Sequence, residues 1–334
     1  MRLVDEFGER EIIEIIFKCL ESMPNAPVPF GDDASAIDIG GGRLAVVKTD
    51  MLVGRTDVPP GMSFWQAARK AVVMNVSDLA AKGVQPIAVL ASIGLPRGLT
   101  KEEIEEIGRG LNDGAREYGA YILGGDTNEA SDLVISCAAF GICTKQGFMK
   151  RSGAEPGDLV AVTGFFGKTA SGLKILLRGF SAPPKIKNVL VDAVLMPKAR
   201  LKEGLILAQT QAVTSSIDSS DGLAWSLHEL SLASHVGFTI DFLPIAQEAK
   251  EFAEAHNLDL AELALYGGEE YELVVTVKPK LWKKAEEALK EVGSNLIKIG
   301  FVTEEPTLLL KTKERTVHIE ARGWEHFKMP HASK

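Results

Sequence analysis

The chain has 334 residues and a formal net charge of −8, with 46% hydrophobic and 25% charged residues. This length predicts two domains, because single hydrophobic cores rarely grow beyond roughly 250–300 residues. The acidic balance argues against a nucleic acid as the main partner, and no apolar run reaches the roughly 18 residues that cross a bilayer. The N-terminus also lacks the basic start of a signal peptide, so we expect a cytoplasmic protein with no membrane partner.

The first half of the chain predicts a mixture of helices and strands. Apolar residues at helical spacing indicate a helix near residues 9–22, and a loop rich in Pro, Gly and Asp follows at 24–36. Ser63 and Gln66 form a capping box that opens the next helix, which Gly83 ends. The other predicted elements are strands at 43–50, 87–95, 121–126 and 133–143 and a helix at 101–119.

Residues 145–158 concentrate glycine, proline and charge, which is typical of a linker. We therefore expect an N-terminal domain at 1–147 and a C-terminal domain at 148–334. The elements expected in the second domain are strands at 159–164, 237–242, 270–277 and 296–302, helices at 171–179, 201–210, 223–234 and 281–291, a proline-bearing connection at 181–185 and a hairpin at 307–320. Because strands and helices alternate without a strict βαβ rhythm, the expected fold class is α/β or α+β with mixed sheets.

The stretch GFFGKTAS at residues 164–171 follows a predicted strand and precedes a predicted helix. It is close to a phosphate-binding P-loop, but that loop needs four residues between its first glycine and the Gly-Lys pair. Here only Phe165 and Phe166 stand between Gly164 and Gly167. The pattern therefore predicts a tight strand-to-helix turn whose helix dipole can still face an anion, and Lys168 is not expected to be catalytic.

Aspartates at the ends of predicted elements are the stronger signal. Each one has an ordinary explanation, since aspartate favours turns and helix caps. As a set, they form a candidate metal or phosphate site that draws on both halves of the chain: Asp32, Asp33, Asp50 beside Thr49, Asp78, Asp126, Asp218 and Asp221.

Asp78 is the aspartate that capping does not explain. It lies in an apolar helix within about two turns of the Gly83 stop, where the helix dipole disfavours a carboxylate. On its face of the helix, positions 71, 74 and 75 are Ala, Met and Asn, so either a distant Lys or Arg or a bound metal must neutralise it. Carboxylates and a threonine hydroxyl without nearby Cys or His suit Mg²⁺, which is usually completed by phosphate oxygens.

Eight motifs follow one another along the chain: GDDASA (31–36), TDMLV (49–53), NVSDLAAKGVQP (75–86), GGDT (124–127), RSGAEPGD (151–158), VTGFFGKTASGL (162–173), IDSSDGL (217–223) and YGGEEYEL (266–273). Together they resemble the thiamine-monophosphate kinase family, within the PurM-like superfamily of aminoimidazole ribonucleotide synthetase-like ATP-binding proteins. The resemblance implies a two-domain PurM-like fold in which the N-terminal sheet pairs with that of a second copy in a homodimer. It also implies a nucleotide held without a P-loop.

The resemblance further implies an enzyme that uses ATP and Mg²⁺ to phosphorylate thiamine monophosphate to thiamine diphosphate. The implied ligands of several Mg²⁺ ions are Asp33, Thr49, Asp50, Asp78, Asp126, Asp218 and Asp221. The implied ATP contacts are Gly125, Asp126, Arg151 and Ser220, and the implied acceptor contacts are Glu269 and Trp324. Because the acceptor oxygen already carries negative charge, such a transfer needs no general base and depends on positioning and charge neutralisation.

Two positions depart from the family pattern, both on the acceptor side. Asp57 stands where the family usually has a histidine, and the usual GGEDYE reads GGEEYE, with Glu270 in place of aspartate. We expect Asp57 to contact the cationic thiazolium ring. Two alternatives stay open: another enzyme of the superfamily, of the aminoimidazole ribonucleotide synthetase type, and a nucleotide-binding dimer without turnover.

Overall fold

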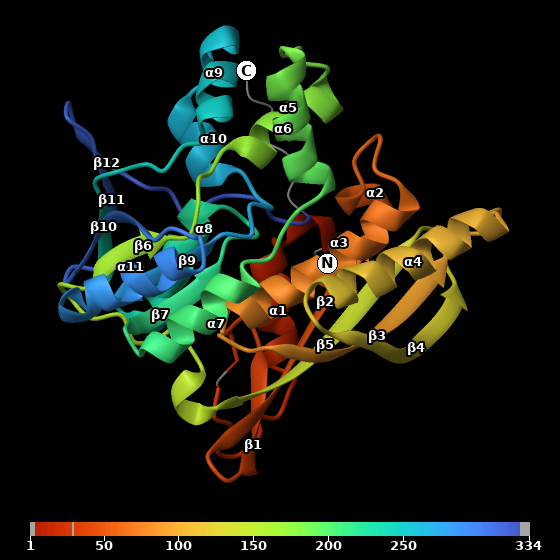
Figure 1. Cartoon of the computed structure of the whole chain (residues 1–334), viewed down its shortest axis with the longest axis horizontal. Coiled ribbons are helices and arrows are strands. Elements are labelled where there is room, and N and C mark those ends of the chain that lie inside the picture. Colours follow the sequence, from red (N-terminus) through yellow and green to blue (C-terminus); the bar gives the residue numbers. More distant parts are fainter. Residues whose placement is uncertain (1–3, 29, 328–334) are drawn as a thin grey trace.

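The computed structural model describes residues 4–28 and 30–327, so the outer ends of the two expected domains lie outside the described residues. Two sheets organise the chain, one in each half, with helices packed against them (Figure 1). This architecture confirms the expected α/β fold class with mixed sheets. Among the described residues, no helix is long and apolar enough to cross a membrane.

The first sheet has five strands in the order β1-β2-β5-β3-β4, of which β3 and β4 are parallel. Its strands are β1 (Ser35–Gly40), β2 (Arg43–Val53), β3 (Pro86–Leu95), β4 (Tyr121–Glu129) and β5 (Val134–Thr144). The sequence analysis missed β1, which it assigned in part to a loop. β1 pairs with β2 through a tight hairpin, because Gly40, Gly41 and Gly42 all adopt the positive φ that such a turn needs.

Two helices, α3 (Phe64–Ala81) and α4 (Lys101–Glu117), cover the inner face of this sheet (Figure 1). The predicted capping box is present, since Ser63 Oγ accepts from the backbone N–H of Gln66 and the Gln66 side chain accepts from the Ser63 N–H. Gly83 follows α3 with a φ of +69°, and an added Cβ would lie 2.4 Å from the Cβ of Ala208. Both the start and the stop of this helix are therefore as predicted.

The second sheet has seven strands in the order β12-β11-β8-β10-β6-β9-β7 within the described residues. They are β6 (Leu159–Val162), β7 (Val213–Asp218), β8 (Gly237–Ile240), β9 (Leu273–Val277), β10 (Ile297–Thr303), β11 (Leu308–Lys311) and β12 (Thr316–His318). The helices of this half are α5 (Lys168–Arg178), α6 (Pro184–Leu195), α7 (Leu201–Thr210), α8 (Leu223–Ser234), α9 (Gln247–His256), α10 (Leu260–Tyr266) and α11 (Trp282–Glu291). The sequence analysis missed α6, α9 and α10. Proline fits the first turn of a helix, so Pro184 opens α6 instead of marking only a connection.

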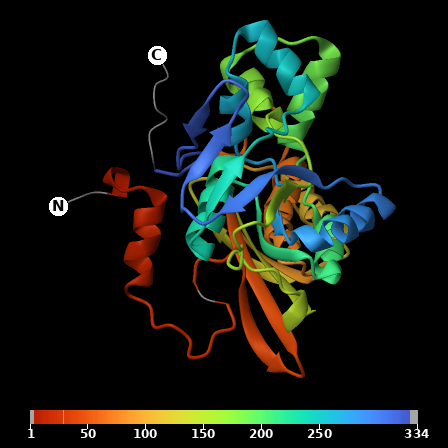
Figure 2. The ribbon, with the colours of Figure 1, turned by 90° about the vertical axis from the view of Figure 1, so that its left-hand side faces the viewer.

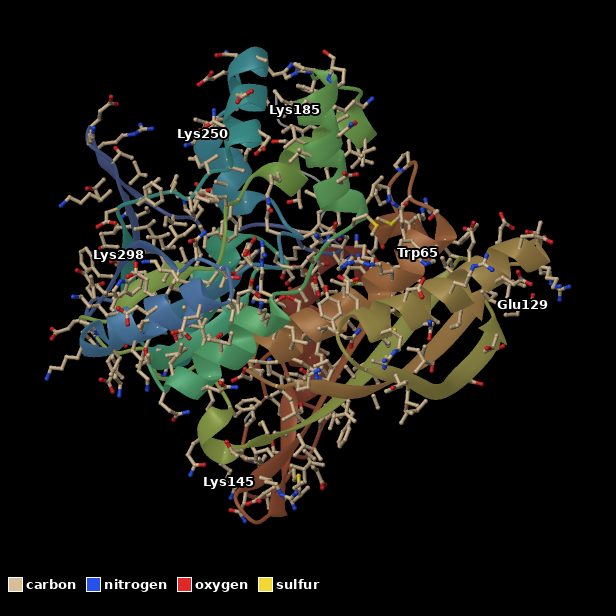
Figure 3. The ribbon with its side chains drawn as sticks, in the orientation of Figure 1. Trp65, Glu129, Lys145, Lys185, Lys250 and Lys298 are labelled. Carbon is tan, nitrogen blue, oxygen red and sulfur yellow. The ribbon has the colours of Figure 1, made fainter. Side chains whose placement is uncertain are left out.

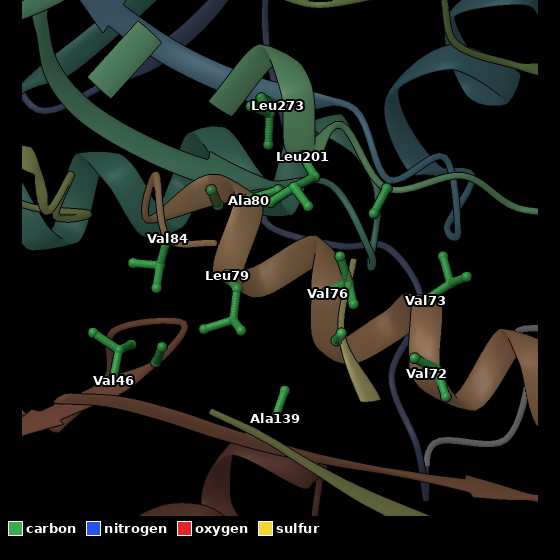
Figure 4. Close-up of a cluster of buried hydrophobic side chains, with 14 of the residues drawn as sticks. Val46, Val72, Val73, Val76, Leu79, Ala80, Val84, Ala139, Leu201 and Leu273 are labelled. Carbon is green, nitrogen blue, oxygen red and sulfur yellow. The ribbon is translucent and has the colours of Figure 1, made fainter. Parts of the chain in front are cut away.

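Helix α3 packs against both halves of the chain, so one core runs through it (Figure 4). The side chains drawn there include Val46 and Ala139 from the first sheet, Val76, Leu79 and Ala80 from α3, and Leu201 and Leu273 from the second half. The approach of α7 is close, because a Cβ on Gly204 would lie 2.0 Å from the carbonyl oxygen of Ala80. The expected linker is also packed here, since Phe148 and Met149 are buried. The two halves of the chain therefore share a hydrophobic core, and the segment between them is packed into it.

The outer face of the first sheet is exposed and apolar. Its exposed side chains include Ile37, Ile39, Val47, Met51, Leu90, Tyr121 and Ile142. Helix α1 (Glu9–Phe17) is shorter than the predicted 9–22 and stands beside the body of the molecule (Figure 2). Its predicted apolar face is not covered in the described structure, because Ile13, Ile15 and Ile16 are exposed.

Candidate active site

Three buried carboxylates meet where α3 faces the second half of the chain. Asp33 follows the glycine turn at Gly31, Asp78 lies in the last turns of α3, and Asp218 ends β7. One carboxylate oxygen of each lies within 4.8 Å of the others, and all three residues are buried. Ser77 Oγ donates a 2.6 Å hydrogen bond to Asp218. The structure therefore brings together three of the acids that the sequence singled out, from both expected domains.

Lys48 is the cation that Asp78 requires. Its Nζ lies 3.0 Å from Asp78 Oδ2 and 3.4 Å from Asp50 Oδ1. Lys48 and Asp50 alternate with Thr49 along β2, so both point inward from the sheet toward α3. The distant lysine that the sequence analysis left open is thus present, and it also brings Asp50 to the edge of the cluster.

Two further cations hold Asp33. Lys82 Nζ is fully buried, lies 2.8 Å from Asp33 Oδ2 and donates to Asp32 at 2.7 Å. Arg151 Nε donates to Asp33 Oδ1 at 2.6 Å, and a second guanidinium nitrogen lies 3.1 Å from Glu229. Arg151 is therefore an internal partner of the acid cluster and not a solvated linker charge.

Burial controls the protonation of the cluster. It raises the pKa of Asp218 to about 6 and that of Asp221 to about 7. Burial also raises the pKa of Asp78 well above its usual value, and the nearby lysine offsets this only in part. Burial acts in the same direction on Asp33, but the Arg151 guanidinium and a buried lysine outweigh it and lower the pKa. A divalent cation at this place would shift all four toward the ionised form.

The donor atoms of the cluster fit Mg²⁺. They are carboxylate oxygens, the hard ligands that this ion prefers. Lys82 Nζ lies 2.8 Å from Asp33 Oδ2, whereas Ser219 Oγ, next to Asp218 in the chain, is buried without a hydrogen-bond partner among the described residues. Buried polar atoms are normally satisfied, and a water ligand of a bound cation would satisfy this hydroxyl.

Thr49 and Asp126 lie on the outer face of the first sheet. Thr49 Oγ1 donates to the carbonyl oxygen of Cys137 at 3.0 Å, and strand alternation turns its side chain away from that of Asp50. Asp126 is exposed on the edge strand β4 and pairs with Ser92, which is exposed as well. Within one chain, the structure does not bring these two side chains to the buried cluster.

Gly125 on β4 lies level with Asp50 on β2 across the first sheet, with one residue of β5 and one of β3 between them. Three strand spacings of about 4.8 Å separate the two backbones by roughly 14 Å. A side chain at Gly125 would bring its Cβ to 1.7 Å from the carbonyl oxygen of Ala91, so the backbone itself forms this surface. Gly125 and the acid cluster are thus separate parts of a single chain.

The turn after β7 gathers the remaining predicted residues. The carbonyl oxygen of Ser220 accepts from the Glu269 N–H at 2.6 Å, and that of Asp221 accepts from the Trp324 N–H at 3.1 Å. A Cβ on Gly323 would lie 2.1 Å from the Asp221 oxygen, so the C-terminal segment packs tightly on the turn. The Trp324 side chain stays 51% exposed. Ser220, Glu269 and Trp324 therefore line one region beside Asp221.

Asp57 and Glu269 meet through a lysine. Asp57 lies in the short helix α2 (Gly54–Asp57), and its Oδ2 accepts from the Val53 N–H at 2.7 Å. Lys70 Nζ donates to the carbonyl oxygen of Asp57 at 2.9 Å and forms an ion pair with the Glu269 carboxylate. The position that departs from the family pattern is thus adjacent to the predicted acceptor residues.

The GFFGKTAS stretch forms the turn from β6 into α5, as predicted. Gly167 caps the helix with a φ of +94°. The Thr169 N–H donates to Glu270 Oε1 at 3.2 Å, and its hydroxyl donates to the carbonyl oxygen of Gly268 at 2.6 Å. Burial raises the pKa of Glu270 to about 7. A carboxyl group of the chain itself therefore occupies the positive end of this helix.

Comparison with known proteins agrees with this geometry. The family model "AIR synthase related protein, N-terminal domain" matches residues 31–143, and its C-terminal counterpart matches residues 155–312. The thiamine-monophosphate kinase of Pyrococcus horikoshii is 38% identical over 94% of this chain and 96% of its own length. That of Nitrosopumilus maritimus is 38% identical over 85% of this chain and 89% of its own.

The chain belongs to the thiamine-monophosphate kinase family. Its backbone resembles the solved structure "AaThiL complexed with AMPPCP and TMP" with a TM-score of 0.84 and 28% identity, over 98% of this chain and 99% of the other. The PurM-like fold expected from the eight motifs is therefore confirmed. The relatives also favour this family over the aminoimidazole ribonucleotide synthetase type.

The sequence analysis missed three lysines whose side chains point into the protein: Lys48, Lys70 and Lys82. Ordinary lysines such as Lys145 and Lys185 lie at the periphery (Figure 3), whereas Lys70 and Lys82 are at most 1% exposed. Each of the three interrupts an apolar run, in AVVKTD, AARKAVV and LAAKGV. A lysine in such a run needs buried acceptors, and that signal was available in the sequence.

Proposed function

We propose that the protein transfers the γ-phosphoryl group of ATP to thiamine monophosphate with the help of Mg²⁺, forming thiamine diphosphate and ADP. The observation that carries the proposal is the meeting of Asp33, Asp78 and Asp218 within 4.8 Å. The alignment with thiamine-monophosphate kinases over 94% of the chain supports it, as does the similarity to a structure named for AMPPCP and TMP.

The inner carboxylates would hold the metal ions: Asp33, Asp50, Asp78, Asp218 and Asp221. When bound, Mg²⁺ supplies neutralisation of the phosphate oxygens and polarisation of the transferred group. Lys48 and Lys82 keep the carboxylates close together against their mutual repulsion. Because the acceptor is itself a phosphate, no residue has to remove a proton, and the chain contributes alignment of the two anions.

In this proposal, nucleotide and acceptor meet at the turn after β7, where the Glu269 N–H donates to the Ser220 carbonyl oxygen. Arg151 and Ser220 flank the acid cluster on the nucleotide side. Glu269 and the exposed Trp324 ring form the acceptor side, where a flat aromatic surface and a carboxylate suit a cationic ring. Asp57 adds a second carboxylate near Glu269, although its Oδ2 is already bonded to the Val53 N–H.

We further propose that the working unit is a cytoplasmic homodimer that forms through the outer face of the first sheet. The exposed apolar side chains on that face support this, since exposed patches of this kind mark interaction surfaces. Thr49 and Asp126 lie on the same face, so a second copy would cover the two predicted ligands that lie outside the inner cluster. Gly125, the remaining predicted nucleotide contact, adjoins this face, and we retain 1–147 as the dimerising domain.

A direct assay tests the activity. The purified protein is incubated with ATP, thiamine monophosphate and Mg²⁺, and ADP and thiamine diphosphate are quantified against a sample with EDTA. Metal-dependent formation of both products in equal amounts is expected. Stabilisation of the fold by ATP without any thiamine diphosphate would instead identify a nucleotide-binding dimer without turnover.

A further inference from the structure

Lys70 is a buried cation that joins the two halves of the chain. It lies in α3, is 1% exposed, and its ammonium bonds the main-chain oxygen of Asp57 at 2.9 Å and the carboxylate of Glu269. A buried ammonium is stable only when it is paired and hydrogen-bonded. These two partners, one from each matched family domain, therefore define its position.

Glu269 is held in place by its backbone as well. It has a φ of +63°, which is unusual for a residue with a side chain, and its N–H donates to the Ser220 oxygen at 2.6 Å. Tyr271 repeats the pattern with a φ of +53° and a 2.9 Å bond to the Ser219 oxygen. Strained backbone of this kind persists where the surrounding structure requires it, often at functional sites. The result is a carboxylate that meets Lys70 on one side and keeps 25% of its side chain exposed on the other.

We propose that Lys70 is a positioning residue for the phosphate acceptor: it fixes the Glu269 carboxylate toward the acceptor and holds α2 beside it. This inference rests on the proposed function. Lys70 is enclosed, so it acts through Glu269 and does not itself contact the acceptor. Without the ammonium, Glu269 loses its buried partner and turns toward solvent, and the acceptor end of the site loses its alignment with the nucleotide end.

Arg69 provides a matched control on the same helix. It is 2% exposed and pairs with Glu117 of α4, and it donates to the carbonyl oxygen of Pro197 at 2.9 Å. Its partners lie away from the acceptor residues. Replacing Arg69 therefore removes a buried cation of similar burial from α3 without changing the surroundings of Glu269.

The test compares Lys70→Met, Arg69→Met, Glu269→Gln and the Lys70→Met/Glu269→Gln double variant. KM for thiamine monophosphate, KM for ATP and kcat are measured, together with acceptor binding by calorimetry in the absence of ATP. Lys70→Met should raise the acceptor KM about tenfold or more and leave the ATP KM within about twofold. Arg69→Met should lower the unfolding temperature while the acceptor KM stays within about twofold.

The double variant separates positioning from mere stability. If Lys70 acts through Glu269, the double variant should bind the acceptor as Glu269→Gln does, so the two effects should not add. Additive losses, or equal acceptor losses in Lys70→Met and Arg69→Met, would overturn the inference. If Lys70→Met does not fold, the double variant replaces it, because it buries no unpaired carboxylate. Its acceptor binding is then compared with that of Glu269→Gln. A wild-type protein that forms no thiamine diphosphate would instead overturn the proposed function.

Discussion

The acid cluster and the N-terminus of α5 both place buried carboxyl groups beside a glycine turn, but their oxygens are satisfied differently. At α5, Glu270 accepts from the Thr169 N–H, and Glu272 accepts from Thr163 Oγ1 at 2.7 Å and from Arg200 Nε at 2.8 Å. In the acid cluster, one oxygen of each of three carboxylates lies within 4.8 Å of the others, and the chain offsets their charge with ammonium groups, Lys48 at 3.0 Å from Asp78 and Lys82 at 2.8 Å from Asp33.

This difference separates a structural anion from a ligand site. A carboxyl group whose donors all come from the chain stabilises the fold and has no free oxygen for a ligand. Carboxylates that face one another repel unless a cation joins them. The motif that resembles a phosphate loop therefore stabilises the fold, whereas the scattered aspartates are the proposed metal site.

The largest expected effect comes from Asp78→Asn. The amide keeps the shape of the side chain but removes one of the three carboxylates of the proposed metal site. We expect the Mg²⁺-dependent rate to fall by about 10³-fold or more, because metal stabilisation of a transferring phosphoryl group is worth several kcal/mol. Turnover and Mg²⁺ binding by calorimetry measure this.

Asp38→Asn is the matched control for that change. Asp38 is exposed, forms an ion pair with the exposed Lys145, and accepts a hydrogen bond from the Gly40 N–H at 3.0 Å. Its loss should leave turnover within about twofold. Full metal-dependent activity in Asp78→Asn would show that Asp78 serves only as the structural partner of Lys48.

Arg200→Met tests the buried carboxyl groups beside the N-terminus of α5. It should lower the stability of the fold without changing turnover. Glu272 is 1% exposed, and losing Arg200 leaves its charge buried with only the Thr163 hydroxyl bond described above. We expect a loss of about 3 kcal/mol in the free energy of unfolding, measured by urea denaturation, with kcat within about twofold at a temperature where the variant is folded. Arg97→Met, which breaks an exposed pair with Glu129, should cost about 0.5 kcal/mol or less. Equal losses in the two variants would contradict the structural role.

The same contrast explains what the sequence could predict. Asp78 could be singled out because a carboxylate near the end of an apolar helix violates a local rule, and the β6–α5 turn followed from the spacing of its glycines. The partner of Asp78 could not be predicted, because Lys48 lies 30 residues earlier on a strand whose pairing only the fold defines. The face of the first sheet on which the Asp126 side chain lies depends on the shift in register between Val89 and Leu90 in the β3–β4 pairing. A one-residue shift turns a side chain to the other face of a sheet.

Glu270→Gln should change the pH dependence of stability. Burial raises the pKa of Glu270 in the folded protein to about 7, above the usual 4.5. The folded state therefore holds this proton more tightly, so its stabilising contribution is present at low pH and is lost as the pH rises through about 7. Between pH 5.5 and 8.5 the wild type should lose about 2 kcal/mol from this group, whereas the glutamine variant should not. Urea unfolding at both pH values measures the difference, and parallel curves for the two proteins would contradict the raised pKa.

Lys168→Ala should have the smallest effect on activity, and this is what distinguishes the α5 turn from a phosphate loop. In a P-loop the equivalent lysine reaches the transferred phosphates, so its loss would abolish turnover. Here Lys168 lies beside Glu270 and helps to lower the pKa of that buried carboxyl. We expect kcat and the ATP KM to stay within about twofold, while the pH at which stability falls moves upward because Glu270 loses a neighbouring cation. A loss of turnover as large as that of Asp78→Asn would indicate that the nucleotide binds at the GFFGKTAS turn. An upward shift of the pH profile of stability, with unchanged kinetics, would support nucleotide binding at the acid cluster.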